Sequence, residues 1–142
     1  MTEQKQNVSL ASLLTPSKTV TVDYPTLNGF SVDLCYLARE ELIKLRSRCV
    51  SQKLNRKTRA FEETLDEDKF LTEYCKAVIK GWKGLKYKYL EELLLVDISG
   101  LNPEDELEFS VENAETLMKN GSDFDTWVTE VTGDLENFTK TK

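Results

Sequence analysis

The amino-acid sequence predicts a mainly α (α+β) fold, a small helical domain of about four to five helices with an N-terminal β-hairpin. Apolar residues recur every three or four positions in Asp66–Leu85 and again in Asp123–Phe138, which is typical of amphipathic helices. Strict alternation is confined to Thr19–Tyr36, where an Asn28-Gly29 pair divides two short runs. At 142 residues the chain has the length of one domain with a core of its own.

The two alternating runs near the N-terminus predict the β-hairpin. Thr19–Tyr24 is rich in β-branched residues, and Phe30–Tyr36 is apolar at its even positions. The Asn-Gly pair between them favours a tight turn. Because a lone two-stranded hairpin is marginally stable in water, we expect it to pack on the helices or to pair with another strand.

The segment Asp66–Leu85 is predicted to be the central helix. Asp66 is a suitable N-cap, acidic residues occupy the first turn, and the helix is expected to end near Gly81. At about 100° per residue, its apolar side chains cover an arc of roughly 200°, which is wider than an ordinary amphipathic stripe. We therefore expect neighbouring elements to cover this helix on two sides.

The same periodicity assigns the remaining segments. They are the helices Ala38–Gln52, Tyr87–Leu95, Val111–Lys119 and Asp123–Phe138, with connections at Lys53–Thr64 and Val96–Phe109. Ser110 and Ser122 are the expected N-caps of the last two helices.

The predicted organisation is one domain with two short extensions. Residues 1–17 are expected to form a flexible N-terminal arm, and residues 139–142 are expected to form a frayed tail. The domain covers residues 18–138 and consists of the hairpin at 18–36 and a helical part at 38–138.

Composition excludes several kinds of chemistry. The chain has no histidine, which removes Ser-His-Asp and Cys-His nucleophilic sites and His-ligated metals. Cys35, Cys49 and Cys75 form no CxxC pair and are expected to be buried, reduced thiols. No P-loop or EF-hand spacing occurs, and no apolar run is long enough to cross a membrane. We expect no enzyme activity, cofactor, metal or membrane partner, although carboxylates alone could still form a site.

Charge is distributed unevenly along the chain, whose net charge is −6. Arg39–Arg59 holds eight basic and two acidic residues, whereas Glu91–Glu136 holds fourteen acidic residues and one basic residue. These blocks can be plain solvated surface, can steer partners, or can pair with each other or with a second copy in a homo-oligomer. The basic run Lys44–Arg59 could bind nucleic acid, but no DNA-binding helix pair frames it, so we regard nucleic acid as the weaker alternative.

Several segments together resemble the tail assembly chaperones of long, non-contractile-tailed bacteriophages. The resemblance spans about Gly29–Phe138 and rests on the order and spacing of Phe30–Leu34, Ala38–Leu42, Leu65–Phe70, Ile79–Leu85, Phe109–Ala114 with Leu117, Ser122–Asp125 and Leu135–Phe138. The resemblance implies a non-catalytic protein that binds the helical tape measure protein, keeps it soluble and helps to recruit tail tube protein. It also implies a location in the host cell cytoplasm and absence from the mature virion.

The apolar stripe of the last predicted helix is either core or a groove for a partner. Core is the favoured alternative, because amphipathic helices usually bury their stripe in their own domain. As a hypothesis, we place the tape measure contact on apolar residues of this stripe and a neighbouring tryptophan, with Glu91–Glu136 as an acidic rim that keeps the complex soluble. The proposed contact residues are Trp82, Phe124, Trp127, Val131, Leu135 and Phe138.

Two other functions remain open at this stage. One is a structural tail or tail-completion protein that is retained in the virion. The other is a small nucleic-acid-binding regulator that uses Lys44–Arg59, whose binding would weaken steeply with salt.

Overall fold

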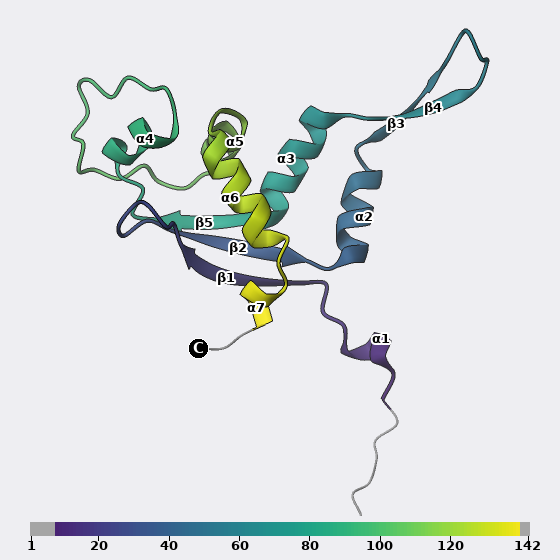
Figure 1. The fold of residues 1–142 in the computed structure, drawn as a ribbon, viewed down its shortest axis with the longest axis horizontal. Coiled ribbons are helices and arrows are strands. Elements are labelled where there is room, and N and C mark those ends of the chain that lie inside the picture. The colour runs from purple at the N-terminus through teal and green to yellow at the C-terminus, as the bar shows by residue number, and fades with distance from the viewer. Residues whose placement is uncertain (1–7, 140–142) are drawn as a thin grey trace, which may run out of the picture.

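The structure, a computed structural model, describes residues 8–139 (Figure 1). Residues 1–7 of the predicted N-terminal arm and residues 140–142 of the predicted C-terminal tail lie outside this range. The described residues form seven helices and five strands in the order α1 (Leu10–Leu13), β1 (Ser17–Asp23), β2 (Ser31–Leu37), α2 (Arg39–Ser47), β3 (Val50–Leu54), β4 (Phe61–Leu65), α3 (Glu67–Val78), β5 (Ile79–Lys83), α4 (Tyr87–Leu93), α5 (Val111–Asn120), α6 (Ser122–Thr132) and α7 (Glu136–Thr139).

The prediction of a mainly α fold is wrong, because the fold is mixed and contains two small antiparallel sheets. Three of the five strands, β3, β4 and β5, form where the sequence pattern predicted a helix or an irregular connection. Helices α1, α4 and α7 are also shorter than two full helical turns, so they add little helical structure.

The three-stranded sheet has the order β1-β2-β5. Strands β1 and β2 pair antiparallel from Ser17 opposite Leu37 to Asp23 opposite Ser31, so the hairpin expected from the sequence is present. Strand β5 pairs antiparallel with the other edge of β2, with a register shift at Asp33/Leu34. The third strand and the helices over the sheet supply the support that an isolated hairpin lacks.

Strand β5 corrects the prediction of a helix that reaches Gly81. Asp66 is the N-cap of α3, since its side chain accepts a hydrogen bond from the Lys69 N–H at 3.1 Å. The helix nevertheless ends at Val78, and the chain enters β5 at Ile79 without a loop. The predicted apolar arc of the central helix is too broad because it includes Ile79 and Trp82. Both are buried residues of strand β5 and not of a helix.

Strands β3 and β4 form a hairpin that we call the arm, residues Val50–Leu65. The predicted helix Ala38–Gln52 ends early, at Ser47, and the arm projects away from the rest of the fold (Figure 1). Its turn is held by Asn55, whose Oδ1 accepts hydrogen bonds from the backbone N–H groups of Lys57 at 2.9 Å and Thr58 at 3.4 Å. At its base, the Asp66 N–H donates to the Cys49 carbonyl at 2.8 Å.

The core lies between the sheet and the helices α3, α5 and α6. Phe30 and Leu34 come from the sheet side, and Phe124 and Val128 come from α6. Aromatic stacking reinforces this packing, with Phe30 and Phe124 ring centroids 6.3 Å apart. Cys35, Cys49 and Cys75 are all free and buried, which confirms the expectation of reduced, buried thiols.

The predicted last helix, Asp123–Phe138, is divided in two. Helix α6 ends at Thr132 with Gly133 as its C-cap, and α7 begins at Glu136. The N-cap of α6 is Gly121 rather than Ser122, and no side-chain cap forms there. Phe138 is buried, with its ring centroid 5.4 Å from that of Tyr36, so the chain end still closes the core.

Candidate functional site

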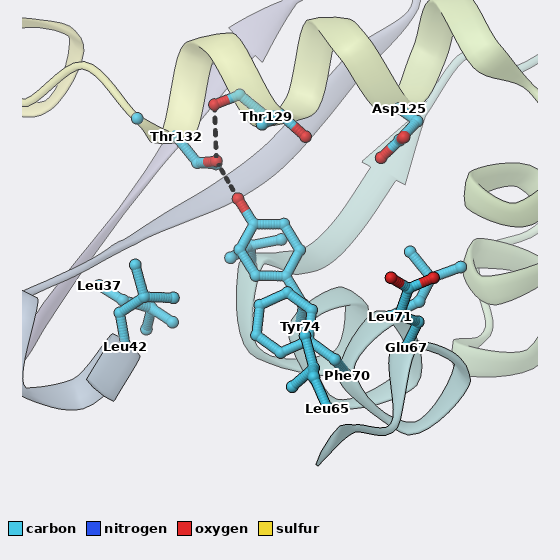
Figure 2. Close-up of a pocket in the computed structure, with 12 residues that line it drawn as sticks. Leu37, Leu42, Leu65, Glu67, Phe70, Leu71, Tyr74, Asp125, Thr129 and Thr132 are labelled. Atoms are coloured by element: carbon cyan, nitrogen blue, oxygen red, sulfur yellow. Dashed lines mark hydrogen bonds between the residues drawn. The ribbon is translucent and has the colours of Figure 1, made fainter. Parts of the chain in front are cut away.

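An apolar groove of about 550 Å³ lies between helices α2, α3 and α6 (Figure 2). Helix α3 supplies most of its floor, with Phe70, Leu71, Tyr74 and Val78 at the spacing of one helical face. The full lining is Leu37, Leu42, Leu65, Glu67, Phe70, Leu71, Tyr74, Val78, Asp125, Thr129, Thr132 and Gly133.

The groove is open because the elements around α3 do not cover all of its apolar surface. Leu37 at the end of β2 and Leu42 on α2 line one side, and Thr129 on α6 lines the opposite side (Figure 2). Phe70 stacks on Tyr74 with ring centroids 5.7 Å apart, so the floor contains a pair of aromatic rings. Both of these side chains are only half-buried, which leaves apolar surface available to a ligand.

One polar network lies within the groove and ties α3 to α6. The Thr132 hydroxyl donates to the Val128 carbonyl at 2.7 Å, so the Tyr74 hydroxyl is the donor in its own 2.7 Å bond to Thr132 Oγ1. Burial raises the pKa of Tyr74 above its ordinary value of 10.0; the hydrogen bond with Thr132 offsets part of this rise, and the Asp125 carboxylate adds a small further rise. Tyr74 is therefore a neutral, oriented part of the groove at physiological pH.

The rim of the groove is acidic. Glu67 lies in the first turn of α3 and Asp125 in the first turn of α6, and both line the groove. An apolar floor with a negative rim suits a ligand that presents an apolar stripe flanked by basic groups.

None of the six residues proposed from the sequence as partner contacts lines this groove. Trp82, Phe124 and Phe138 are buried in the core. The Trp82 Nε1–H donates to the Leu107 carbonyl at 2.9 Å, and its ring meets Phe109 edge-on at 5.1 Å, so it anchors the loop before α5.

The other three proposed contacts are more accessible. Trp127 and Val131 are half-buried against the core, and Trp127 meets the Tyr24 ring edge-on at 4.8 Å. Leu135 is 51% exposed in the connection after α6. The stripe therefore packs mainly as core, and α6 meets the groove with a different flank.

The sequence did contain a signal for the groove. Residues 125, 129 and 132 recur at helical spacing on the predicted last helix, and residues 70, 71, 74 and 78 form one apolar face of the predicted central helix. The prediction that α3 is covered on two sides did not identify which part of its surface stays open.

The basic run Lys44–Arg59 is spread over three different elements. It begins on α2, continues through β3 and ends in the turn of the arm, where Arg56, Lys57 and Arg59 are exposed. Strand β4 places Glu62 and Glu63 beside this basic segment.

Residues 8–139 contain neither a candidate metal site nor a candidate membrane span. They contain no group of three or more His, Cys, Asp or Glu side chains that could hold a metal ion. In the same part of the chain, no helix has the length and apolar character needed to cross a membrane.

Fold and site together define a small α+β protein with an acid-rimmed apolar groove and a projecting β-hairpin. Comparison with protein families matches residues 39–142 to the YdaY prophage protein family, and the chain belongs to this family. It is therefore a phage-derived protein. No curated protein and no solved structure matches the chain.

Proposed function

We propose that this protein is a non-catalytic tail assembly chaperone that holds an apolar helical stripe of the tape measure protein in the groove between α2, α3 and α6. The observation that carries the proposal is the half-buried apolar face of α3, which is lined with aromatic and aliphatic side chains and bordered by carboxylates. Membership in a prophage protein family and the resemblance of Gly29–Phe138 to tail assembly chaperones support it.

The physical basis is the burial of apolar surface by helix-in-groove docking. An amphipathic helix presents anchors at positions i, i+3, i+4 and i+7, and a groove of about 550 Å³ has room for a few of them. Full burial of each large apolar side chain contributes roughly 1.5–3 kcal/mol. The acidic rim at Glu67 and Asp125 stays in water and keeps the complex soluble.

The proposed contact surface is the groove and not the apolar stripe of the last predicted helix. A partner can reach Tyr74, Leu71 and Phe70 without opening the core, so these three residues are the candidate anchors. Phe124 and Phe138 are buried and are no longer candidates. Recruitment of tail tube protein belongs to the role that the resemblance implies, and it needs a second surface outside the groove.

The test is co-expression with the tape measure protein of the same phage, read as the fraction of tape measure protein that stays soluble. Leu42 lines the groove and is 39% exposed, and Ile43 beside it on α2 is 53% exposed and outside the lining. Leu42→Glu is expected to abolish the solubilising effect, and Ile43→Glu is the matched control. Full solubilisation by Leu42→Glu contradicts the proposal.

A second measurement separates a chaperone from a structural tail protein. Mass spectrometry of purified virions is expected to find tape measure and tail tube proteins but not this chain, which should remain in the host cytoplasm. Stoichiometric amounts of the chain in the particle contradict the chaperone role.

A further inference from the structure

We propose that the arm of one copy docks in the groove of a second copy, and that this reciprocal contact is the resting state of the protein. The arm ends in an exposed apolar pair, because Leu54 and Phe61 are cross-strand partners and are 55% and 71% exposed. Cross-strand partners project from the same face of a hairpin, so the two side chains form one apolar patch next to the turn. A projecting two-stranded hairpin with such a patch is marginal in water until something covers it.

The apolar face of the arm leads into the groove. Side chains alternate along a strand, so Val50 opposite Leu65, at the base, shares a face with Leu54 opposite Phe61, at the tip. Leu65 itself lines the groove. Groove and arm therefore offer one extended surface with apolar residues at its two ends and the Gln52–Glu63 pair between them.

The charges of the two ends are complementary. The turn of the arm carries Arg56, Lys57 and Arg59, all exposed. The groove carries Glu67 and Asp125 at its rim. When Leu54 and Phe61 pack on the floor of the groove, the basic side chains of the turn come close to the acidic rim. The arm therefore presents apolar residues flanked by basic groups, as expected of a ligand for this groove.

The occupant is a second copy because an arm does not reach its own groove. The base of the arm borders the groove at Leu65, while the tip projects away from the body (Figure 1). Two copies related by a two-fold axis can place each tip on the groove of the other copy. Arm and groove then form a self-complementary interface, in which both copies use the same residues.

This inference rests on the proposed function in one respect, since the arm and the tape measure helix use the same groove. A free chaperone would cover its groove with the arm of its partner, and the client would displace that arm. Dimerisation and client binding are then mutually exclusive, and each can be measured without the other.

The first experiment measures the mass of the full chain by sedimentation over a range of concentrations. The wild type is expected to dimerise, and the double variant Leu54→Ser/Phe61→Ser is expected to raise the dimer dissociation constant by about tenfold or more. The matched control is Leu95→Ser/Leu101→Ser, which removes two other exposed leucines and should leave the constant unchanged. Circular dichroism checks that each variant keeps the fold.

The second experiment swaps the charges. Arg56→Glu/Lys57→Glu in the arm and Glu67→Lys/Asp125→Lys at the rim should each weaken the dimer. Mixing these two double variants should restore association, because every new arm charge then meets an opposite rim charge. Restoration by mixing supports docking between copies, and its absence counts against the arm–rim contact.

The results separate this inference from the proposed function. A wild type that stays monomeric up to about 100 μM, or a dimer that survives Leu54→Ser/Phe61→Ser, overturns arm docking whatever the tape measure assay shows. Salt-sensitive binding of duplex DNA by the monomer, lost in Arg56→Glu/Lys57→Glu, would assign the arm to nucleic acid and also overturn the inference. A dimer that responds as expected, with unchanged tape measure solubility in Leu42→Glu, supports arm docking and rejects the chaperone groove.

Discussion

The Tyr74 hydroxyl lies 2.7 Å from Thr132 Oγ1, and this hydrogen bond joins α3 to α6 within the groove. It links the floor of the groove, which α3 supplies, to the side that α6 lines (Figure 2). Thr132 also donates a hydrogen bond to the carbonyl of Val128, a buried core residue of α6. A change at Tyr74 is therefore expected to affect both the shape of the groove and the stability of the fold.

Removing that hydroxyl should have a small, measurable cost. Tyr74→Phe keeps the ring and leaves Thr132 bonded to Val128, so no buried group loses its last partner, and we expect a loss of about 0.5–1.5 kcal/mol in the free energy of unfolding. Urea denaturation measures it. Tyr36→Phe is the control, since the structure gives the Tyr36 hydroxyl no hydrogen bond within residues 8–139, and an equal loss in both variants would refute the role of the bond.

Gly84 should not tolerate a side chain. Its φ is +76°, and a Cβ at this position would lie 2.0 Å from the Gly29 carbonyl oxygen. We expect Gly84→Ala to lower the free energy of unfolding by more than about 2 kcal/mol, because backbone strain and a backbone clash combine. Gly100→Ala is the control, since its φ is +88° with nothing within 4 Å, and it should cost only about 1–2 kcal/mol. Equal thermal midpoints for the two variants would contradict the close contact.

The Cys75 thiol should be unreactive in the folded protein. Burial, with a smaller contribution from Glu115, raises the pKa of Cys75 from 9.0 to about 11. Iodoacetamide at pH 8 should label Cys75 only after denaturation, as followed by peptide mass spectrometry. Rapid labelling of the native protein would show that the thiol is accessible.

The same raised pKa gives a stability change with a definite sign. Between pH 9 and 11 the thiol ionises in the unfolded chain but not in the folded one, so the stabilisation present below pH 9 is lost as pH rises. The loss is about 2–3 kcal/mol for a shift of this size. Cys75→Ala should show a shallower decline over this range, and parallel curves for the two proteins would contradict the assignment.

The caps of α3 and α6 should respond differently to alanine. Asp66→Ala removes the bond to the Lys69 N–H and should cost about 1 kcal/mol. Ser122→Ala should be nearly neutral, because Ser122 is the first residue of α6 and makes no side-chain cap. Chemical denaturation compares the free energies of unfolding of the two variants. A larger loss of stability for Ser122→Ala than for Asp66→Ala would support the N-cap role predicted for Ser122 from the sequence.

Local signals in the sequence predicted the elements whose partners are nearby. The Asn28-Gly29 pair and the alternating runs located β1 and β2, and Asp66 and Ser110 were identified as caps that the structure contains. These features are decided by a few adjacent residues, so a single sequence is sufficient.

The strands that were missed depend on more distant contacts. Strand β5 forms because Ile79 and Trp82 pair with β2, more than forty positions earlier in the chain, and a helical wheel contains no such information. The arm is mostly exposed, so its residues alternate weakly between apolar and polar. Asn55, which accepts hydrogen bonds from the turn of the arm, is a local signal by which this hairpin could have been located.

The candidate site was only partly predictable for the same reason. Periodicity identified α3 and α6 as apolar helices, but which flank of each is open depends on how they pack with α2 and β2. The sequence-based hypothesis chose the large aromatic residues Trp82, Phe124 and Phe138 as partner contacts. All three are buried in the core, which is the usual position of large apolar side chains.

The most direct test places a photo-crosslinking amino acid at single exposed positions during co-expression with the tape measure protein. Thr129 lies in the groove lining, and Leu135 lies on the stripe proposed from the sequence. Groove binding predicts tape measure crosslinks from position 129 and none from position 135. Crosslinks from position 135 alone, or from neither position while the tape measure protein stays soluble, would contradict it.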